Sequence, residues 1–462
     1  MYQLDFNKPV KVHFMGIGGI SMSGLAEILL SEGFKVSGSD VKETALTEHL
    51  EKLGAKVFIG QKAENITSDI DVMVYTAAIS PENEEYKAVL AAGIPVLKRA
   101  ELLGEIMRNY KVAVAVSGTH GKTTTTSMVT EILLKAGLDP TVTVGGMLKD
   151  IGGNLRIGHS DHFVAEACEY TNSFLSFFPT IAVILNIEED HLDFFKDIND
   201  IRASFKKFAG LLPDNGTLVI NDSIDRFQEI TEGLGCRVVT YGKSETSDYY
   251  ASDISYDEFG RGSYTLHRKT DSGEETERID LSVVGEHNIY NSMAAVAAAD
   301  AAGADKAVVH DAIKAFTGTD RRFEYKGEAG GVKIIDDYAH HPTEIKATLK
   351  AALNYPHKKL WVVFQPHTYT RTKAFMDDFA DALSMADAVV LTDIYAAREK
   401  NTIGVSSGDL KKKIDAKGTE CHYFSYFDDV ESFLLLHAEP GDMIMTIGAG
   451  DVYQVGEHLL GK

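Results

Sequence analysis

Short apolar runs alternate with amphipathic stretches along the whole chain. Residues 11–40 show this order first, with an apolar run, a glycine-rich turn, a helical pattern and a second apolar run that ends at Asp40. The same alternation continues to about residue 108. Strands that alternate with helices in this way favour a parallel sheet.

Two further blocks repeat the alternation. The block at about 109–318 opens on an apolar run and the sequence GTHGKT, after which Met128, Val129, Ile132 and Leu133 recur at helical spacing. Its other predicted elements are strands at 162–168 and 180–187, a β-rich insert near 236–285 and an alanine-rich helix at 288–303. The last block has predicted strands at 332–338, 359–366, 387–395 and 442–450.

The chain is therefore predicted to be an α/β protein of three domains. Its 462 residues agree with this number at roughly 100–200 residues per domain. The predicted domains are a Rossmann-like N-terminal domain (1–108), a central α/β domain of the P-loop ATPase type (109–318) and a Rossmann-like C-terminal domain (319–462).

Composition excludes several classes of partner. A net charge of −22, from 68 acidic and 46 basic residues, argues against nucleic acid and anionic membranes. No apolar stretch approaches the roughly 18 residues of a membrane helix, and the first residues lack the pattern of a secretory signal. The three cysteines form no C-x-x-C pair. We therefore expect a cytoplasmic protein without disulfides or a structural zinc site.

The sequence GTHGKTT at 118–124 resembles a phosphate loop with one departure. The usual pattern, G-x-x-x-x-G-K-[ST], has its first glycine at the position that Val116 occupies here. Glycines turn backbone N–H groups toward a phosphate, Lys122 supplies a charge and Thr123 can place a hydroxyl on Mg²⁺. The strand before and the helix after are the expected context, so we predict nucleotide binding at this loop.

A second glycine turn follows the first strand. Gly16 and Gly18 match a dinucleotide fingerprint, but Ser21 stands where a third glycine is expected. Asp40 ends the next strand, where an acid that binds a ribose lies in such folds. The pattern indicates a diphosphate at a helix N-terminus and leaves the nucleotide open, NAD included.

Glu166 and His191 each follow an apolar strand in the block of the phosphate loop. A hard cation such as Mg²⁺ prefers carboxylate, hydroxyl and phosphate oxygens, so Glu166 with Thr123 forms a candidate site. Histidine is a less usual ligand for this ion. The competing candidates are Glu169, Glu188, Glu189 and Asp190.

Basic and histidine-rich motifs gather in the third block. Arg322 precedes DDYAHHP (336–342), and His367 and Arg371 follow a predicted strand. Arginine binds carboxylate or phosphate in a bidentate manner, so this block suits an anionic small molecule. The pair His340-His341 lacks the further ligands that a zinc site needs.

In this order, the motifs resemble the Mur ligase family over nearly the whole chain. The resemblance is carried by HFMGIGGISMSGLAEIL, SGSD, VYTAAIS, SGTHGKTTT, GGNL, HFVAEACEY, NIEEDHLD, EHNIYN, GTDRRF, DDYAHHPTEI, FQPHTYTRT and TIGAGD. The chain has Cys168-Glu169-Tyr170 where several relatives have Asp-Glu-Ser. No lysine of DIRASFKKFAG (200–210) is assigned as the carbamylated lysine of some relatives.

The resemblance implies that the first domain binds the UDP part of a sugar substrate and not NAD. It also implies that the central domain binds ATP and Mg²⁺, and that the third domain binds an amino acid and closes on the ATP. The implied ATP contacts are Gly118, Thr119, His120, Gly121, Lys122, Thr123, Thr124, Asn288, Asn291, Arg322 and Asp337, and the implied metal ligands are Thr123, Glu166 and His191. The implied UDP-sugar contacts are Gly16, Gly18, Gly19, Ser39, Asp40, Thr76, Ala77 and Arg99, while Tyr338, His340, His367 and Arg371 border the muramoyl and amino-acid site.

The implied reaction uses ATP to join L-alanine to the lactyl carboxylate of UDP-N-acetylmuramate, through an acyl phosphate, in peptidoglycan precursor synthesis. The candidate catalytic residues are Lys122, His191, Arg322 and His340, and the general base is open between His191, His340 and water. A monomer or homodimer is expected. The alternatives are an NAD-dependent dehydrogenase with an ATP-binding regulatory domain, a non-catalytic ATP-driven switch, a tripeptide-recycling ligase and folylpolyglutamate synthetase.

Overall fold

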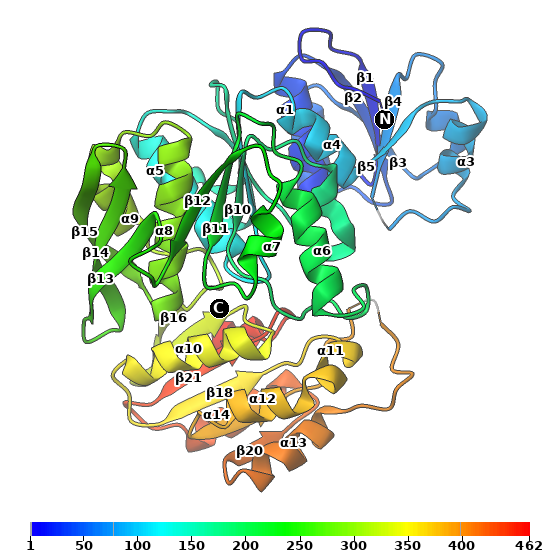
Figure 1. Cartoon of the computed structure of the whole chain (residues 1–462). Helices are drawn as coiled ribbons and strands as arrows, with labels where there is room; N and C mark the ends of the chain where they lie inside the picture. The colour runs from blue at the N-terminus through cyan, green and yellow to red at the C-terminus, as the bar shows by residue number, and fades with distance from the viewer. Residues whose placement is uncertain (1, 77, 398) are drawn as a thin grey trace.

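The computed structural model describes residues 2–76, 78–397 and 399–462. Three sheets follow one another along the chain, and each is the centre of one domain (Figure 1). The observed alternation of strands and helices confirms the predicted α/β fold class. The predicted domain limits at 108/109 and 318/319 fall between sheets and stay predictions.

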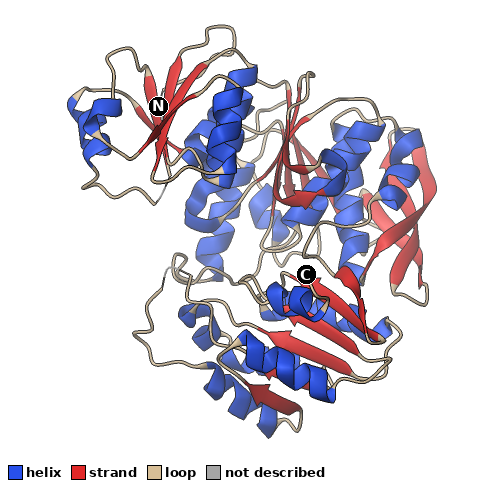
Figure 2. Ribbon diagram, turned by 180° about the vertical axis from the view of Figure 1, so that it is seen from behind, coloured by secondary structure: helices blue, strands red, loops and turns tan. Residues whose placement is uncertain are grey.

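The first domain is a five-stranded parallel sheet in the order β3-β2-β1-β4-β5. Helices cover both of its faces (Figure 2). The strand order reverses between β1 and β4, and ligands bind at such switch points in open α/β sheets. The elements are β1 (Lys11–Met15), α1 (Ile20–Ser31), β2 (Lys35–Asp40), α2 (Ala45–Lys52), β3 (Lys56–Ile59), η1 (Ala63–Asn65), β4 (Val72–Tyr75), α3 (Glu84–Ala91), β5 (Val96–Lys98) and α4 (Arg99–Met107).

The central domain is a ten-stranded sheet in the order β15-β14-β13-β12-β11-β10-β6-β9-β7-β8. The predicted β-rich insert continues this sheet, because β13 pairs in parallel with β12 and then antiparallel with β14. The elements are β6 (Val112–Ser117), α5 (Lys122–Lys135), β7 (Thr141–Leu148), η2 (Lys149–Ile151), β8 (Gly153–Arg156), β9 (His162–Glu166), η3 (Tyr170–Ser176), β10 (Ile181–Ile184), α6 (Ile198–Ala209), β11 (Thr217–Asn221), α7 (Phe227–Thr231), β12 (Arg237–Gly242), β13 (Tyr249–Tyr256), β14 (Arg261–Thr270), β15 (Gly273–Val284), α8 (Glu286–Ala301), η4 (Lys306–Val308) and α9 (Val309–Ala315).

The third domain is a six-stranded sheet in the order β16-β17-β21-β18-β19-β20. All neighbours pair in parallel except β16, which is an antiparallel edge strand. The elements are β16 (Glu324–Ala329), β17 (Val332–Asp337), α10 (Pro342–Asn354), β18 (Leu360–Phe364), α11 (Tyr369–Ala374), α12 (Met376–Leu383), β19 (Ala388–Leu391), α13 (Ser407–Ala416), β20 (Glu420–Tyr423), α14 (Phe427–His437), β21 (Met443–Ile447) and α15 (Tyr453–Leu459).

Helix α5 begins at the phosphate loop and lies in the core of the central domain. The residues that recur at helical spacing, Met128, Val129, Ile132 and Leu133, are all fully buried, as the sequence pattern predicts. The helix packs against the alanine-rich helix α8. The start of α5 is thereby fixed relative to the start of α8, and both starts face the third domain.

The first and central domains share one hydrophobic core. Phe174 of η3 stacks on Phe208 of α6 with ring centroids 4.6 Å apart, and α4 packs against η3. Gly104 allows this approach, since a Cβ at that position would lie 1.9 Å from the carbonyl oxygen of Ser176. Among the described residues, no helix has the length and apolar character of a membrane span.

We expect Gly104→Ala to lower the free energy of unfolding by about 1–3 kcal/mol, because the added methyl group forces backbone to move in a packed region. Urea unfolding measures this effect. Gly408→Ala on α13 is the matched control, since the nearest atom to its added Cβ is Ser406 Oγ at 3.5 Å. Equal stability of the two variants would contradict the close approach of α4 and η3.

Candidate functional site

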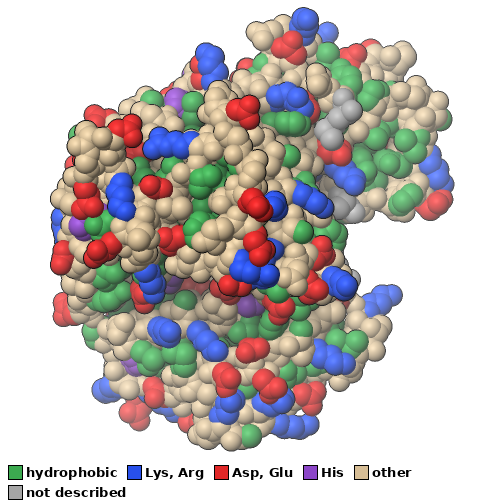
Figure 3. Space-filling model, viewed as in Figure 1, with side chains coloured by type: hydrophobic (Ala, Val, Ile, Leu, Met, Phe, Trp, Pro, Cys, Tyr) green, Lys and Arg blue, Asp and Glu red, His purple; other side chains and the backbone are tan. Residues whose placement is uncertain are grey.

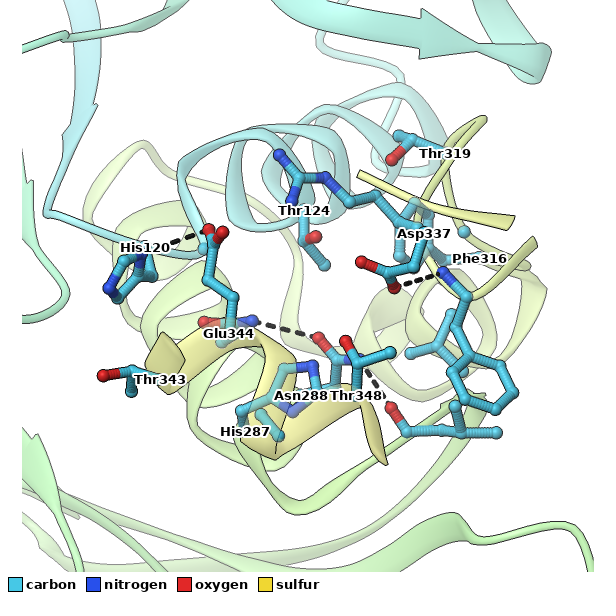
Figure 4. Close-up of a pocket in the computed structure, with 18 of the residues that line it drawn as sticks. His120, Thr124, His287, Asn288, Phe316, Thr319, Asp337, Thr343, Glu344 and Thr348 are labelled. Atoms are coloured by element: carbon cyan, nitrogen blue, oxygen red, sulfur yellow. Dashed lines mark hydrogen bonds and ion pairs between the residues drawn. The ribbon is translucent and has the colours of Figure 1, made fainter. Parts of the chain in front are cut away.

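A cavity of about 260 Å³ lies where the central and third domains meet (Figure 4). The surface is hollowed along this boundary, and side chains of both charge signs lie beside it (Figure 3). Its walls come from the phosphate loop, the start of α8, the segment that joins the two domains and the start of α10. The lining includes the predicted ATP contacts His120, Gly121, Thr124, Asn288, Asn291, Arg322 and Asp337.

The structure of the phosphate loop explains why the first glycine of the usual pattern is absent. Val116 is fully buried inside β6, which continues to Ser117 before the chain turns. Gly118 has φ 143° and Gly121, the N-cap of α5, has φ 85°, so both need the freedom of glycine. A Cβ at Gly121 would also lie 2.7 Å from Asn291 Oδ1. The loop thus starts two residues later than usual and still ends at a helix N-terminus, which favours an anion.

Lys122 lies against the loop that it follows. Its Nζ donates to the carbonyl oxygens of Gly118 at 2.5 Å and Thr119 at 3.1 Å, and to Glu169 Oε2 at 3.0 Å. Burial alone would lower the pKa of Lys122, but the acidic groups around it, Glu169 foremost, together raise it. Glu169, one of the competing acids in the sequence, is therefore the counter-ion of the loop lysine.

Glu166 lies at the end of β9, under a glycine turn of β7 that the sequence pattern did not single out. Gly145 N donates to Glu166 Oε1 at 2.6 Å, and the nearby Thr123 favours the charged form of this carboxylate. A Cβ at Gly145 would lie 2.7 Å from Glu166 Oε2, and one at Gly146 would lie 3.1 Å from Thr123 Cγ2. Burial raises the pKa of Glu166.

His191 adopts a left-handed backbone conformation, with φ 53°. Its Nε2 lies 3.7 Å from Glu169 Oε1, and burial lowers its pKa, so the ring is neutral and able to ligate a metal. The hydroxyl of Thr123, the carboxylate of Glu166 and this imidazole fit Mg²⁺, which binds a few protein ligands and completes its shell with phosphate and water.

Among the described residues, another group of potential metal ligands lies across the domain boundary. Ligand atoms of His120, Glu188 and His341 lie within 4.8 Å of one another. Both ring nitrogens of His341 already have partners, because Thr343 N donates to Nδ1 at 3.3 Å and Nε2 donates to the Glu189 carbonyl at 3.1 Å. We therefore interpret this cluster as a polar link between domains.

Arg322 and Asp337 reach the cavity from the third domain. The Arg322 guanidinium lies 5.3 Å from the ring centroid of Tyr338. Asp337 accepts hydrogen bonds from the backbone N–H groups of Ala339 at 2.7 Å and Phe323 at 2.8 Å. Burial raises the pKa of Asp337 to about 6, although Arg322 opposes this shift.

The predicted amino-acid site gathers two histidines and an arginine. His340 and His367 have ring centroids 5.8 Å apart, and Arg371 Nη1 donates to His367 Nδ1 at 3.1 Å. Arg371 is also paired with Asp190 of the central domain, at 2.9 Å. His340 Nδ1 donates to the Tyr338 carbonyl at 3.0 Å, which leaves Nε2 as its basic nitrogen, and burial lowers the pKa of the ring to about 4.

The predicted UDP-sugar residues lie in the first domain, outside this cavity. Gly16 has φ 81° and donates to the Ser39 carbonyl at 2.8 Å, while Gly19 is the N-cap of α1. Asp40 Oδ2 accepts from Gly18 N at 2.8 Å. Asp40, which lies where related folds have an acid that binds a ribose, therefore forms a hydrogen bond with the glycine turn.

Two other predicted residues border this turn. A Cβ at Gly16 would lie 2.7 Å from Thr76 Cγ2, so the turn passes close to the end of β4. Arg99, at the start of α4, donates from Nη1 to Ser21 Oγ at 3.0 Å. Ala77, also predicted for this site, lies outside the described residues.

The cavity also contains residues that the sequence analysis did not select. His287, Phe316, Thr343 and Glu344 all line it. Glu344 had a recognisable signal, because a proline at the first helical position and a glutamate at the third mark the start of a helix. Nothing in the pattern indicates that this cap would face another domain.

Family models match most of the chain. The model described as "Mur ligase family, catalytic domain" matches residues 11–111, the "Mur ligase middle domain" matches 116–299 and the "Mur ligase, glutamate ligase domain" matches 321–450. Together they cover all three sheets.

Relatives of known name match end to end. A UDP-N-acetylmuramate–L-alanine ligase of Lachnospira eligens is 58% identical, and one of Agathobacter rectalis is 56% identical, each with 100% of both chains covered. The solved structure of a UDP-N-acetylmuramate-alanine ligase from Thermotoga maritima has a TM-score of 0.77 at 29% identity, covering 98% of each chain. A murein peptide ligase from Psychrobacter arcticus has a TM-score of 0.68 at 26% identity, also covering 98% of each.

If the loop binds the phosphates of ATP, as the sequence predicts, Lys122→Ala is expected to slow ATP turnover by about 10²–10³-fold, because it removes the cation of the loop. ADP release measures this loss, and thermal protection by UDP-sugar, whose predicted site is in the first domain, should be unchanged. Lys135→Ala, at the exposed end of the same helix, is the control. ADP release at the normal rate by Lys122→Ala would rule out the loop as the phosphate site.

Proposed function

The chain belongs to the Mur ligase family, and from this premise we propose that it joins L-alanine to UDP-N-acetylmuramate at the expense of ATP. The observation that carries the proposal is the cavity that the phosphate loop shares with the third domain. The identity of the substrates rests on the names of its full-length relatives.

The ATP position follows from the arrangement of the cavity. The adenine would lie against Asn288 and Asn291 at the start of α8, and the triphosphate would run along the phosphate loop toward Lys122. Arg322, which lines the cavity, would contact the phosphates from the third domain. Thr123, Glu166 and His191 would hold Mg²⁺, which when bound neutralises phosphate charge.

The proposed chemistry removes a leaving-group problem. A carboxylate does not react with an amine at neutral pH, because its oxygen is a poor leaving group. One oxygen of the lactyl carboxylate attacks the γ-phosphorus of ATP, the bond to the bridging oxygen breaks, and ADP leaves. Lys122 and Arg322 spread the charge that develops on the transferred group, so catalysis is mainly positioning and electrostatics.

The amine completes the reaction. The nitrogen of L-alanine, once its ammonium group has lost a proton, attacks the acyl carbon, inorganic phosphate leaves, and the nitrogen loses a second proton. His340 is a candidate acceptor because Nε2 of its neutral ring carries the lone pair, although a pKa of about 4 makes this ring a weak base in the absence of substrate. His191 and a water molecule remain alternatives, and His191 is less suited if it ligates the metal.

Rival activities have weaker support. A nicotinamide dehydrogenase needs an acid that is open to the ribose, whereas Asp40 is bonded to the glycine turn. A simple ATP-driven switch does not need the cluster of His340, His367 and Arg371. A tripeptide-recycling activity is the nearest rival, since a murein peptide ligase shares the fold.

The acyl phosphate can be tested without the amino acid. In ATP labelled at the β–γ bridge, we expect isotope exchange that requires UDP-N-acetylmuramate and Mg²⁺ but not alanine, because ADP forms and recombines before the amine attacks. NMR of the phosphorus atoms measures the exchange. Exchange that appears only after alanine is added would contradict a separate phosphoryl transfer.

An amino-acid screen tests the proposed substrate. With UDP-N-acetylmuramate present, we expect sustained phosphate release with L-alanine and much slower release with D-glutamate or with the tripeptide that recycling ligases use. Phosphate release is followed at saturating ATP. Preference for the tripeptide would assign the recycling activity, and NADH binding measured by fluorescence would favour the dehydrogenase.

A further inference from the structure

Glu344, near the start of α10, contacts two parts of the molecule with its two carboxylate oxygens. Oε2 accepts hydrogen bonds from the backbone N–H groups of His340 at 3.0 Å and His341 at 3.3 Å. Oε1 accepts from His120 Nδ1 at 3.1 Å, across the domain boundary (Figure 4). One side chain therefore fixes the turn that carries His340 and ties this turn to the phosphate loop.

His120 is a rigid partner for this contact. Its backbone N donates to Asn186 Oδ1 at 2.7 Å, and its carbonyl accepts from Asn186 Nδ2 at 3.0 Å. Its ring also lies beside that of His341, with centroids 4.9 Å apart. Because backbone and ring are both held, the contact with Glu344 links the start of α10 to a fixed point of the phosphate loop.

The charges around His120 make the contact strong. Its ring lies between Glu344 of the third domain and Glu188 of the central domain, whose Oε2 is 3.5 Å from Nε2. Burial alone would lower the pKa of His120, but these two carboxylates raise it to about 9. The cationic ring thus lies between two acids that would otherwise repel each other. Its charge also offsets the repulsion between these acids and the proposed triphosphate in the cavity.

Other contacts across the boundary reach a different segment. His341 donates to the Glu189 carbonyl at 3.1 Å, and Arg371 pairs with Asp190 at 2.9 Å. These contacts hold the chain before His191. Glu344 reaches the phosphate loop itself.

We infer that Glu344 is a positioning residue, which through His120 sets the third domain in register with the phosphate loop, so that Arg322 meets the nucleotide and His340 meets the reacting amine. The inference rests on the proposed ligase function and deepens it. A misplacement of about 1 Å between reacting groups can cost about 10²-fold in rate. Loss of the contact should therefore lower kcat more than it raises the KM for ATP.

The first test is Glu344→Gln, which keeps an oxygen for the backbone N–H groups and loses the charge that faces His120. We expect kcat to fall about 10- to 100-fold while the KM for ATP changes by less than about 3-fold. The thermal midpoint should stay near that of the wild type, which shows that the variant folds. Lys350→Ala, exposed on the same helix, should leave kcat unchanged.

A double-mutant cycle then asks whether Glu344 acts through His120. We expect His120→Gln combined with Glu344→Gln to be no slower than the slower single variant, within about 2-fold, because both remove one contact. Multiplicative losses, or a Glu344→Gln variant as fast as the wild type, would overturn the inference. A wild-type protein that does not ligate alanine would instead refute the proposed function, so the two failures are distinguishable.

Discussion

The site depends on the contact between two separate sheets. The phosphate loop ends β6 of the central sheet, whereas Asp337 ends β17 of the third sheet, and both line one cavity. The carboxyl ends of parallel strands carry the polar residues in each case, as is usual for α/β folds. Neither sheet holds all the groups that the proposed reaction needs, so the position of the third domain decides whether the site is complete.

Charge is the second constraint on this boundary. The chain carries a net charge of −22, yet the proposed substrates are anions. The basic side chains near this boundary are held in short ion pairs, since Lys122 lies against Glu169 and Arg371 against Asp190. Such pairs keep each cation fixed and charged before substrate arrives. An anionic substrate must replace part of the attraction within each ion pair by its own contacts with the cation. An anion that makes few such contacts therefore binds weakly, which limits non-specific binding.

The sequence predicted those parts of the fold and site that depend on local pattern. The burial of Met128 and Ile132 followed from helical spacing, and the need for glycine at Gly121 followed from the loop motif. The pattern could not show that the turn at Gly145 covers Glu166, nor that Glu344 meets His120, because both contacts join segments distant in sequence. Such contacts are set by how whole elements pack, which no short motif encodes.

In the proposed reaction, the carboxylate of the sugar nucleotide receives the phosphate of ATP, and its acyl group is then transferred to the amine of alanine. The most direct measurement uses UDP-N-acetylmuramate labelled with ¹⁸O in its lactyl carboxylate, together with L-alanine, ATP and Mg²⁺, followed by mass spectrometry of the released phosphate. We expect one ¹⁸O atom to be transferred to phosphate for each amide formed. Amide formation with unlabelled phosphate, or phosphate release without an alanine adduct, would contradict it.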